Sequence, residues 1–285
     1  MESINNLLQS KRRVLITGGA GFIGGALIRR LLKFSNFTIF NLDKISYASD
    51  LTSIERIIEN LEDNDKKRYF FLKCDLVNLT LTEECLQKAN PDIIFHLAAE
   101  SHVDRSISSP ENFIQSNING TYHLLKAAND HYHSLSKKRK EFFRFHHIST
   151  DEVFGSLDDN GLFNENTPYN PRSPYSASKA SSDHLVKAWL HTFGLPVITT
   201  NCSNNFGPWQ FPEKFIPIVI YKALKGEKIP VYGDGSNIRD WLYVEDHIDA
   251  LILSCLKGEI GSSYCIGGSE EKTNNQIAKE ICDIM

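Results

Sequence analysis

No stretch of this sequence approaches the roughly 20 consecutive apolar residues that a helix needs to span a membrane. The first 13 residues are polar and then basic, without an apolar core or a cleavage site, so we expect no secretory signal. Neither sign of charge dominates, because 31 basic and 35 acidic residues give a formal net charge of −4, which disfavours general nucleic-acid binding. The 285 residues are 41 % hydrophobic and 23 % charged, which excludes disordered and collagen-like proteins and fits one large α/β domain, with or without a smaller lobe.

Cysteine is sparse, and no two cysteines have the CxxC spacing of zinc or redox sites. The six are Cys74, Cys85, Cys202, Cys255, Cys265 and Cys282. Most lie in apolar or β-like runs, which indicates buried, reduced thiols in a cytoplasmic protein and argues against a disulfide or zinc framework. The histidine- and lysine-rich segment 131–147 lacks a spacing shared with carboxylates or thiolates, so we expect no metal site.

Short apolar runs without helical periodicity alternate with segments in which apolar residues recur every three to four positions. The runs predict strands at residues 13–17, 37–42, 69–73, 92–97, 143–149 and 196–201. The periodic segments predict a helix that begins near Ala26 and further helices around 51–61, 82–88, 116–129 and 176–193. This alternation predicts βαβ units and an α/β fold with a Rossmann-like, doubly wound parallel sheet.

The pattern changes after Asn205, where prolines and glycines become frequent and the elements become shorter. We therefore predict a first domain over residues 12–205 and a smaller second lobe over residues 206–285. The apolar run that starts at Asp240, and the helix after it, are expected to rejoin the sheet over about residues 240–256. The second lobe is then interleaved with the first domain.

Three glycines, Gly18, Gly21 and Gly24, lie between the first predicted strand and the first predicted helix. Glycines permit a tight turn and close backbone approach, and the helix N-terminus offers free N–H groups to a pyrophosphate. Asp43 ends the second strand, 19 positions after Gly24, where a carboxylate accepts hydrogen bonds from the adenosine ribose of a dinucleotide. Because Asp43 repels a 2′-phosphate, it favours NAD over NADP, and Lys44 beside it softens that preference.

Tyr175 and Lys179 are four positions apart in a predicted helix, so the phenol and the ammonium lie on one face. The lysine, together with the positive nicotinamide ring of a cofactor, is expected to lower the pKa of the tyrosine toward neutrality. Such a tyrosine accepts a proton from a sugar hydroxyl while hydride leaves the same carbon for NAD. Joined to the glycine turn, the pair resembles the short-chain dehydrogenase/reductase superfamily, and the chain length and second lobe resemble its extended branch.

Thr150, Asp151 and Glu152 follow a predicted strand, which places them at the carboxyl edge of the sheet, where ligands bind. Epimerases and simple reductases of the extended branch usually have small or hydroxylated residues there, whereas this chain has two adjacent carboxylates. Neighbouring acids tend to separate their pKa values, so that one remains protonated as an acid and the other is ionised as a base. Elimination of water needs both forms, because one group must donate a proton and another must accept one.

With these residues, the sequence resembles the dTDP-glucose 4,6-dehydratases from about Arg13 to the last residue. The segments that carry the resemblance are 42–48, 96–106, 150–152, 175–179, 204–208, 211–217 and 239–246. The resemblance implies that residues 12–205 bind NAD and that residues 206–285 bind a nucleotide sugar. It also implies a hydro-lyase that converts dTDP-glucose to dTDP-4-keto-6-deoxyglucose, for deoxysugar biosynthesis of the dTDP-rhamnose type.

The same resemblance assigns roles to five residues. Tyr175, helped by Lys179 and Thr150, deprotonates the 4-hydroxyl of glucose as hydride passes from C4 to NAD. The new ketone makes C5–H acidic, Glu152 removes that proton, and Asp151 protonates the departing 6-hydroxyl. Hydride then returns to C6, so the cofactor is regenerated in each turnover and is expected to stay bound.

The resemblance adds further binding residues to the glycines, Asp43, Tyr175 and Lys179 named above. The cofactor would contact Gly18, Gly21, Phe22, Ile23, Gly24, Asp43, Lys44, Ile45, Ser46, Asp75, Leu76, Leu97, Ala98, Ala99, Ser101, Ser116, Tyr175, Lys179 and Asn205. The substrate would contact Ser101, Thr150, Asn204, Lys214, Phe215, Pro230, Val231, Tyr232, Arg239 and Asn274. The guanidinium of Arg239 suits a diphosphate, because its N–H groups pair with two oxygens at once.

The superfamily also implies a homodimer, in which the helices around 116–129 and 176–193 pair across a two-fold axis as a four-helix interface. The apolar residues that either form this interface or pack on the sheet are Leu124, Leu125, Leu185, Val186 and Trp189.

The sequence departs from the family at several positions near the acids. Phe154 and Phe206 replace common tyrosines, Trp209 and Gln210 stand where Tyr-His is usual, and Ser116 replaces a threonine. Family members continue past the position of Met285 with an arginine-containing segment over the nucleotide, so we expect the second lobe to be truncated.

Three alternatives stay open beside the dTDP-glucose reaction. Nothing in the sequence plainly reads the thymine methyl group, so the same reaction on UDP-glucose is the nearest alternative. A UDP-sugar epimerase would leave the paired carboxylates without a role. A catalytically silent NAD-binding scaffold protein is the alternative from a different functional class.

Overall fold

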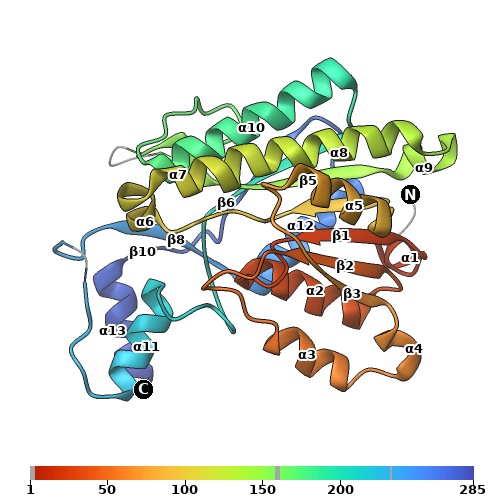
Figure 1. The fold of residues 1–285 in the computed structure, drawn as a ribbon. Coiled ribbons are helices and arrows are strands. Elements are labelled where there is room, and N and C mark those ends of the chain that lie inside the picture. Colours follow the sequence, from red (N-terminus) through yellow and green to blue (C-terminus); the bar gives the residue numbers. More distant parts are fainter. Residues whose placement is uncertain (1–3, 158–160, 232) are drawn as a thin grey trace.

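Seven parallel strands form the main sheet, in the order β3-β2-β1-β4-β5-β6-β9 (Figure 1). The computed structural model describes residues 4–157, 161–231 and 233–285. The strands are β1 Arg13–Thr17, β2 Thr38–Asp43, β3 Tyr69–Lys73, β4 Ile93–His96, β5 Arg144–Thr150, β6 Val197–Cys202 and β9 Ser263–Ile266. The order runs outward from β1 in both directions, which confirms the predicted doubly wound arrangement and places a topological switch point between β1 and β4.

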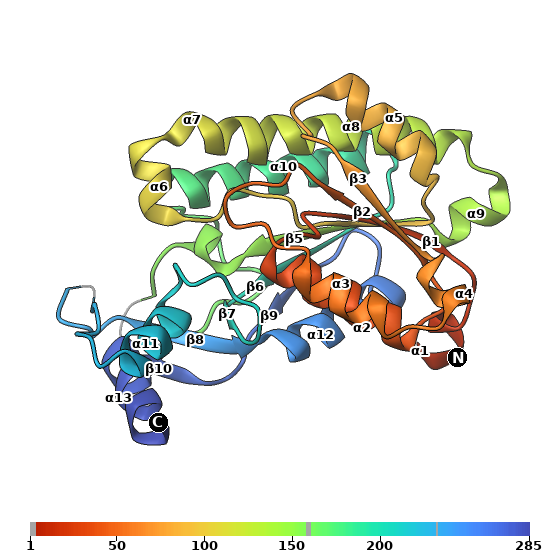
Figure 2. The same ribbon diagram turned by 60° about the horizontal axis from the view of Figure 1, so that its bottom comes forward.

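Helices cover both faces of this sheet (Figures 1 and 2). One layer contains α5 Leu79–Ala89, α8 Gly120–Ser134 and α10 Pro174–Phe193, and the other contains α2 Phe22–Phe34, α3 Thr52–Glu59 and α12 Val244–Lys257. Shorter helices are α1 Ile4–Leu8, α4 Asp63–Lys66, α6 Val103–Ser108, α7 Pro110–Phe113, α9 Lys137–Phe142 and the 3₁₀ helix η2 Asp151–Phe154. The helix predicted around 116–129 begins irregularly, because the π-helical segment η1 Ile114–Asn119 precedes α8.

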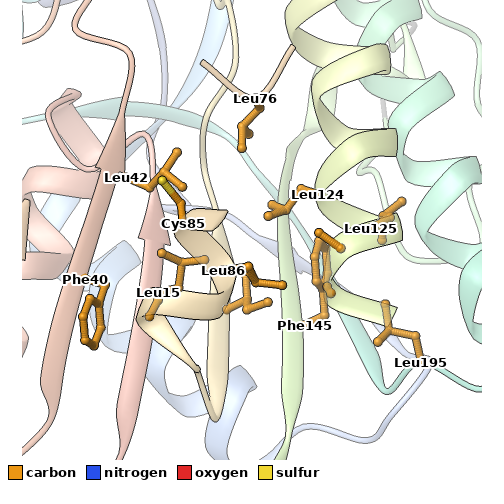
Figure 3. Close-up of a cluster of buried hydrophobic side chains, with 14 of the residues drawn as sticks. Leu15, Phe40, Leu42, Leu76, Cys85, Leu86, Leu124, Leu125, Phe145 and Leu195 are labelled. Carbon is orange, nitrogen blue, oxygen red and sulfur yellow. The ribbon is translucent and has the colours of Figure 1, made fainter. Parts of the chain in front are cut away.

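The strands bury both faces, because successive residues of one strand point to opposite helix layers. Leu15 of β1 and Phe145 of β5 belong to the cluster shared with α5, α8 and α10, which Figure 3 shows. Val14 and Ile16 of β1 point the other way and pack in a second cluster with Leu27 of α2. Burial on both faces explains why these strands read as continuous apolar runs.

A smaller three-stranded sheet, in the order β10-β8-β7, lies in the C-terminal part of the chain. Its strands are β7 Asn204–Phe206, β8 Ile238–Tyr243 and β10 Glu271–Thr273, and the helices of this part are α11 Phe215–Leu224 and α13 Asn274–Ile284. The run from Asp240 was expected to rejoin the main sheet, but β8 instead pairs with β7 and β10. Of the predicted segment 240–256, the helix α12 returns to the main sheet, where Val244 and Ile248 pack in the second cluster.

The seventh strand of the main sheet is β9, which pairs in parallel with β6. The sequence analysis missed it, because four half-buried or exposed residues give too short a pattern to read. The division of the chain at residues 205 and 206 stays a prediction.

The structure also bears on three expectations from the sequence, which concern membrane spans, thiols and metal sites. No helix in the described part of the chain is long and apolar enough to cross a membrane. All six cysteines are free: Cys74, Cys85, Cys202 and Cys255 are buried, Cys265 is half-buried and Cys282 is exposed. In residues 4–157, 161–231 and 233–285, no group of three or more His, Cys, Asp or Glu side chains is arranged to hold a metal ion.

A buried carboxylate connects helix α10 to strand β5. Asp183 accepts hydrogen bonds from His147 Nε2 at 2.9 Å, from Ser149 Oγ at 2.8 Å and from the Tyr169 hydroxyl at 2.9 Å. His147 and Ser149 belong to β5 and Asp183 to α10, and all three are buried. The network therefore fixes the carboxyl end of β5 against the helix that packs on it.

We predict that Asp183→Ala lowers the free energy of unfolding by about 3 kcal/mol, because two buried donors and the half-buried hydroxyl of Tyr169 lose their shared acceptor. Urea denaturation followed by circular dichroism measures this change. Asp249→Ala is the matched control, since Asp249 pairs with Arg30 at the surface, and its cost is expected to stay below about 1 kcal/mol. Equal losses for the two variants would contradict the structural role of Asp183.

Candidate active site

A cavity of about 380 Å³ lies at the carboxyl ends of the central strands. Such edges, at the switch point of an open α/β sheet, are where ligands bind in this class of fold. The residues singled out from the sequence that line it are Gly18, Gly21, Phe22, Ile23, Gly24, Asp43, Lys44, Ser46, Asp75, Leu76, Leu97, Ala98, Ala99, Ser101, Ser116, Thr150, Asp151, Glu152, Tyr175, Lys179, Asn204, Asn205, Lys214 and Phe215. The fold therefore brings most of the candidate residues together.

Five of the candidate residues are not among those that line this cavity. Ile45 lies between two lining residues of the loop after β2, with a φ of 59°. Pro230 and Val231 lie between α11 and β8, and the buried Asn274 begins α13. Arg239 of β8 donates to the carbonyl of Ile238, and its charge still reaches the carboxyl groups of the cavity. Tyr232 lies outside the described residues.

The glycine turn leaves no room for side chains. Gly18 has a φ of +71°, and a Cβ atom there would lie 2.7 Å from the backbone nitrogen of Ala98. A Cβ atom on Gly24 would lie 2.3 Å from the carbonyl oxygen of Gly18, so the turn and the first turn of α2 touch directly. Gly21 precedes α2 and has no side chain to cap it, which leaves the N–H groups of the first turn for a ligand anion.

Asp43 is held rigidly at the end of β2. Its carboxylate accepts hydrogen bonds from the backbone N–H of Ala20 at 3.0 Å and of Ile45 at 2.8 Å, and from Ser49 Oγ at 3.2 Å. A carboxylate offers about four acceptor positions, so three donors leave one for a ribose hydroxyl. The glycine turn and this carboxylate together fit the two ends of the adenosine diphosphate half of a dinucleotide.

Lys44, which was expected to soften the preference for NAD, is engaged elsewhere. Its Nζ donates to Glu100 Oε1 at 2.8 Å and to Ser116 Oγ at 3.1 Å. The ion pair with Glu100 neutralises the ammonium, so Lys44 is not a free cation for a 2′-phosphate. The preference set by Asp43 is therefore stronger than the sequence suggested.

Tyr175 and Lys179 lie in the first turns of α10, where Ser173 and Ser176 form a capping box at the helix start. Lys179 is buried, and its Nζ donates to the carbonyl of Ile148 at 2.8 Å. Burial raises the pKa of Tyr175 well above its ordinary value, the charge of Glu152 adds to the rise, and a hydrogen bond with Thr150 opposes it. Lys179 is not among the groups that set this direction, since its ammonium is directed to a backbone carbonyl, and the lowering predicted for Lys179 together with a nicotinamide ring stays a prediction.

Asp151 and Glu152 begin η2, directly after β5. Thr150 arranges the pair, since its Oγ1 donates to Asp151 Oδ1 at 3.2 Å and accepts from the backbone N–H of Glu152 at 3.3 Å. Burial, and then the charge of Glu152, raise the pKa of Asp151 to about 6. Burial also raises the pKa of Glu152, but the positive charges of Arg239 and Lys214 oppose that rise. The two adjacent carboxyl groups therefore have different electrostatic surroundings, as an acid and a base require.

Some cavity residues were given no role from the sequence. Glu100 and Glu213 lie within the motif segments 96–106 and 211–217, so membership of a motif was the available signal. Asn117, which supports the cavity wall without lining it, gave no signal, because its position depends on the π-helical turn of η1. Its side chain accepts from Glu100 N at 2.8 Å and donates to Glu100 O at 3.0 Å and to Ser178 Oγ at 2.9 Å, which fixes the loop after β4 against α10.

Comparisons of the sequence with known proteins agree with this geometry. The model of the GDP-mannose 4,6 dehydratase family matches residues 15–285. The dTDP-glucose 4,6-dehydratase of Neisseria meningitidis serogroup B is 51 % identical over 277 residues, which cover 96 % of this chain and 76 % of the relative. The enzyme of the same name from Haemophilus influenzae is 50 % identical over 273 residues, which cover 95 % of this chain and 79 % of the relative.

Solved structures resemble the chain over the same range. The dTDP-glucose 4,6-dehydratase DesIV from Streptomyces venezuelae, solved with NAD bound, has a TM-score of 0.85 at 38 % identity and covers 96 % of this chain and 80 % of its own. The enzyme from Bacillus anthracis in complex with NAD has a TM-score of 0.81 at 39 % identity, with 95 % and 80 % covered. A UDP-glucose 4-epimerase from Thermus thermophilus, also with NAD, reaches 0.81 at 25 % identity, with 96 % and 83 % covered. From its sequence, its fold and the residues around its cavity, the chain belongs to the dTDP-glucose 4,6-dehydratase family of extended short-chain dehydrogenases/reductases.

Proposed function

We propose that this chain is an NAD-dependent dTDP-glucose 4,6-dehydratase, which converts dTDP-glucose to dTDP-4-keto-6-deoxyglucose. The observation that carries the proposal is the pair of mostly buried carboxyl groups of Asp151 and Glu152, in the same cavity as Tyr175 and Lys179. A tyrosine and a lysine serve oxidation at one carbon, whereas removal of water needs a further acid and a further base. Relatives that are about half identical carry the name of this reaction.

NAD is the cofactor that the cavity residues suit, and related dehydratases have been solved with it. The crowded glycine turn and the uncapped start of α2 would hold the pyrophosphate, and Asp43 would accept from the adenosine ribose. Held there, NAD would supply the redox chemistry of the reaction, as acceptor and then donor of one hydride. The remaining steps are proton transfers, and these fall to side chains of the chain itself.

Tyr175 takes the proton of the 4-hydroxyl as C4 becomes a ketone. Burial alone disfavours the phenolate, so the contacts that stabilise it matter. Among these, the hydrogen bond with Thr150 lowers the pKa of Tyr175. Lys179 adds a fixed positive charge one helical turn away, where the carbonyl of Ile148 holds its ammonium.

Glu152 and Asp151 divide the elimination between them. The 4-ketone makes the C5 hydrogen acidic, and Glu152 removes it, while Asp151 donates a proton to the leaving 6-hydroxyl, so that water departs. The raised pKa of Asp151, about 6, keeps part of its population protonated near neutral pH. Arg239 and Lys214 favour the ionised form of Glu152, which is the form that a base needs.

The nucleotide sugar occupies the side of the cavity next to the smaller sheet. Lys214 and Arg239 supply the positive charge that a diphosphate requires, and both act on the carboxyl groups through their fields. Asn204 and Phe215 line this side of the cavity. We assign Ser101, Pro230, Val231, Tyr232 and Asn274 to the same binding surface as part of the proposal.

The proposal includes a homodimer formed by the outer faces of α8 and α10. Leu124, Leu125 and Val186 are fully buried against the sheet, so they belong to the core and not to the interface. The support comes from exposed aromatic rings on the outer faces, since Tyr122 of α8 and Phe193 of α10 are more than a third exposed. Leu185 and Trp189 are partly buried beside them.

Six free cysteines support a cytoplasmic location, where thiols stay reduced.

The first prediction from this proposal is a product assay. Purified protein with NAD is expected to convert dTDP-glucose to a 4-keto sugar, which is detected by its absorbance in alkali. UDP-glucose is the second arm, and faster product formation from it would assign the uridine nucleotide in place of thymidine. Product from neither sugar would overturn the dehydratase proposal.

A second prediction concerns the protonation of Asp151. In a carbon-13 NMR titration, its carboxyl group is expected to titrate near pH 6, about two units above an ordinary aspartate. Glu152→Gln is expected to lower this midpoint, because a neighbouring negative charge is removed. Thr150→Val is expected to raise it, because the hydrogen bond that favours the ionised form is lost. A midpoint that neither substitution moves would show that the assigned electrostatic causes are wrong.

A third prediction separates the two carboxyl roles by isotope exchange. With dTDP-glucose in deuterated water, Glu152→Gln is expected to oxidise C4 but to exchange the C5 hydrogen at least roughly a hundredfold more slowly than the parent. Asp151→Asn is expected to keep this exchange and to release water at least roughly a hundredfold more slowly. Glu83→Gln is the matched control, since Glu83 pairs with Lys126 on the surface. If Glu152→Gln exchanged C5–H at the parent rate, the base would have to be another residue.

A further inference from the structure

Residues 207–214, which we call the strap, connect β7 to α11 and pass along the cavity. Four residues of the strap line it, namely Gln210, Phe211, Glu213 and Lys214. The loop after β2, which carries Lys44, Ser46 and Ala48, also lines the cavity. The strap and this loop therefore contribute two parts of one wall, although they are more than 150 residues apart in sequence.

Tyr47 joins these two parts. Its hydroxyl donates to Glu213 Oε1 at 3.0 Å, and its ring meets that of Phe211 edge-on, with centroids 5.9 Å apart and an interplanar angle of 84°. The guanidinium of Arg105 lies 3.5 Å from the centroid of the Tyr47 ring, which is a close cation–π contact. One side chain of the loop after β2 therefore contacts the strap twice.

Glu213 is the point at which these contacts converge. Its Oε2 lies 3.7 Å from Arg105 Nη2 and 3.9 Å from His102 Nε2, while its Oε1 accepts from Tyr47. The side chain is only 17 % exposed, although it belongs to a connecting segment. The next residue, Lys214, donates from Nζ to the carbonyl of Ser101 at 3.3 Å. The C-terminal end of the strap is thus fastened to the loops after both β2 and β4.

The middle of the strap is held differently. A second cavity of about 240 Å³ lies against residues 209–212, with Arg29 and Ser53 among its other lining residues. Beside the Tyr47–Phe211 ring contact, this region has a hydrogen bond from Gln210 Nε2 to the carbonyl of Asn205 at 2.9 Å. It also has a cation–π contact, in which the guanidinium of Arg56 lies 5.1 Å from the ring centroid of Trp209. Segments with few buried apolar contacts open locally at a low free-energy cost. The attachment at Glu213, where a tyrosine, an arginine and a histidine meet one carboxylate, therefore contributes much to the position of the strap.

We propose that Tyr47 and Glu213 are positioning residues that hold the strap closed along the dinucleotide cavity, so that NAD is retained between the two hydride transfers. This inference rests on the proposed function, because that reaction uses the same cofactor molecule twice in one turnover. Two electrons leave C4 with the first hydride, and the same two electrons return to C6. If the reduced cofactor dissociated between the two hydride transfers, the sugar would remain oxidised, because no hydride would be available to reduce C6.

The strength of the attachment suits this role. Each contact is partly exposed, and such contacts contribute little on their own. Together they slow the release of a bound dinucleotide without preventing the strap from opening when the cofactor first enters. The tyrosine and the carboxylate act as one unit, because each is a partner of the other.

The experiment measures cofactor exchange and needs no sugar turnover. Protein loaded with NAD is separated from free NAD and mixed with an excess of the fluorescent analogue etheno-NAD, and the exchange rate is followed by fluorescence. Tyr47→Phe keeps the ring over Arg105 and removes only the hydroxyl, and it is expected to speed NAD release roughly fivefold. Glu213→Gln is expected to speed it by roughly tenfold.

The controls separate positioning from folding. Tyr221→Phe is the matched variant, because Tyr221 is an exposed tyrosine with Lys225 4.5 Å from its ring centroid, on α11 and away from the strap. It is expected to release NAD at the parent rate. The thermal midpoint of the cofactor-free protein is expected to be the same for the parent and all three variants. The double variant Tyr47→Phe/Glu213→Ala is expected to release NAD no faster than Glu213→Ala alone, because alanine removes the acceptor of the Tyr47 hydroxyl.

Two results would overturn the inference. One is release of NAD by Tyr47→Phe at the parent rate, and the other is an additive effect in the double variant, which would mean that the two residues act separately. Failure of the proposed function is seen in a different measurement, as absence of 4-keto product with the parent protein, and it leaves the exchange rates readable.

Discussion

Two adjacent carboxyl groups in a mostly buried place repel each other when both are ionised, and the cavity of this protein is arranged around that repulsion. Asp151 and Glu152 follow one another in sequence, so no rearrangement of the fold can separate them. What the fold sets is the difference between the electrostatic surroundings of the two carboxyl groups. Arg239 favours the ionised form of both acids, whereas Lys214 favours that of Glu152, and the charge of Glu152 in turn raises the pKa of Asp151.

The remaining machinery holds that pair in position relative to the tyrosine. Asp151 and Glu152 continue strand β5, whereas Tyr175 and Lys179 belong to helix α10. Asp183, two turns further along α10 by sequence, accepts hydrogen bonds from two residues of β5. Lys179 also bonds to the backbone of β5. Asp151, Glu152 and Tyr175 are thus parts of one strand–helix unit, which suits the proton transfers at neighbouring carbons of one sugar that we propose.

Much of this arrangement was predictable from the sequence, because the signals were local. The glycine turn, Asp43, the triplet at 150–152 and the Tyr175–Lys179 pair all lie next to strands or helices that the apolar pattern defines. Features that depend on contacts between distant segments were not predictable. The pairing of β8 with the small sheet, the ion pair of Lys44 with Glu100 and the role of Asn117 on a π-helical turn each require the tertiary structure. The buried surroundings of Tyr175 were not predictable for the same reason, since burial cannot be read from two residues at helical spacing.

The position of β9 has a consequence for how the chain is made. This strand pairs with β6, but 60 residues separate them, and that intervening stretch forms β7, α11, β8 and α12. During synthesis, β6 emerges with one side unpaired, and its partner is translated only near residue 263. An unpaired strand edge is a template for pairing with other chains. Nascent copies of this protein therefore pass through an aggregation-prone interval, which ends when β9 completes the sheet.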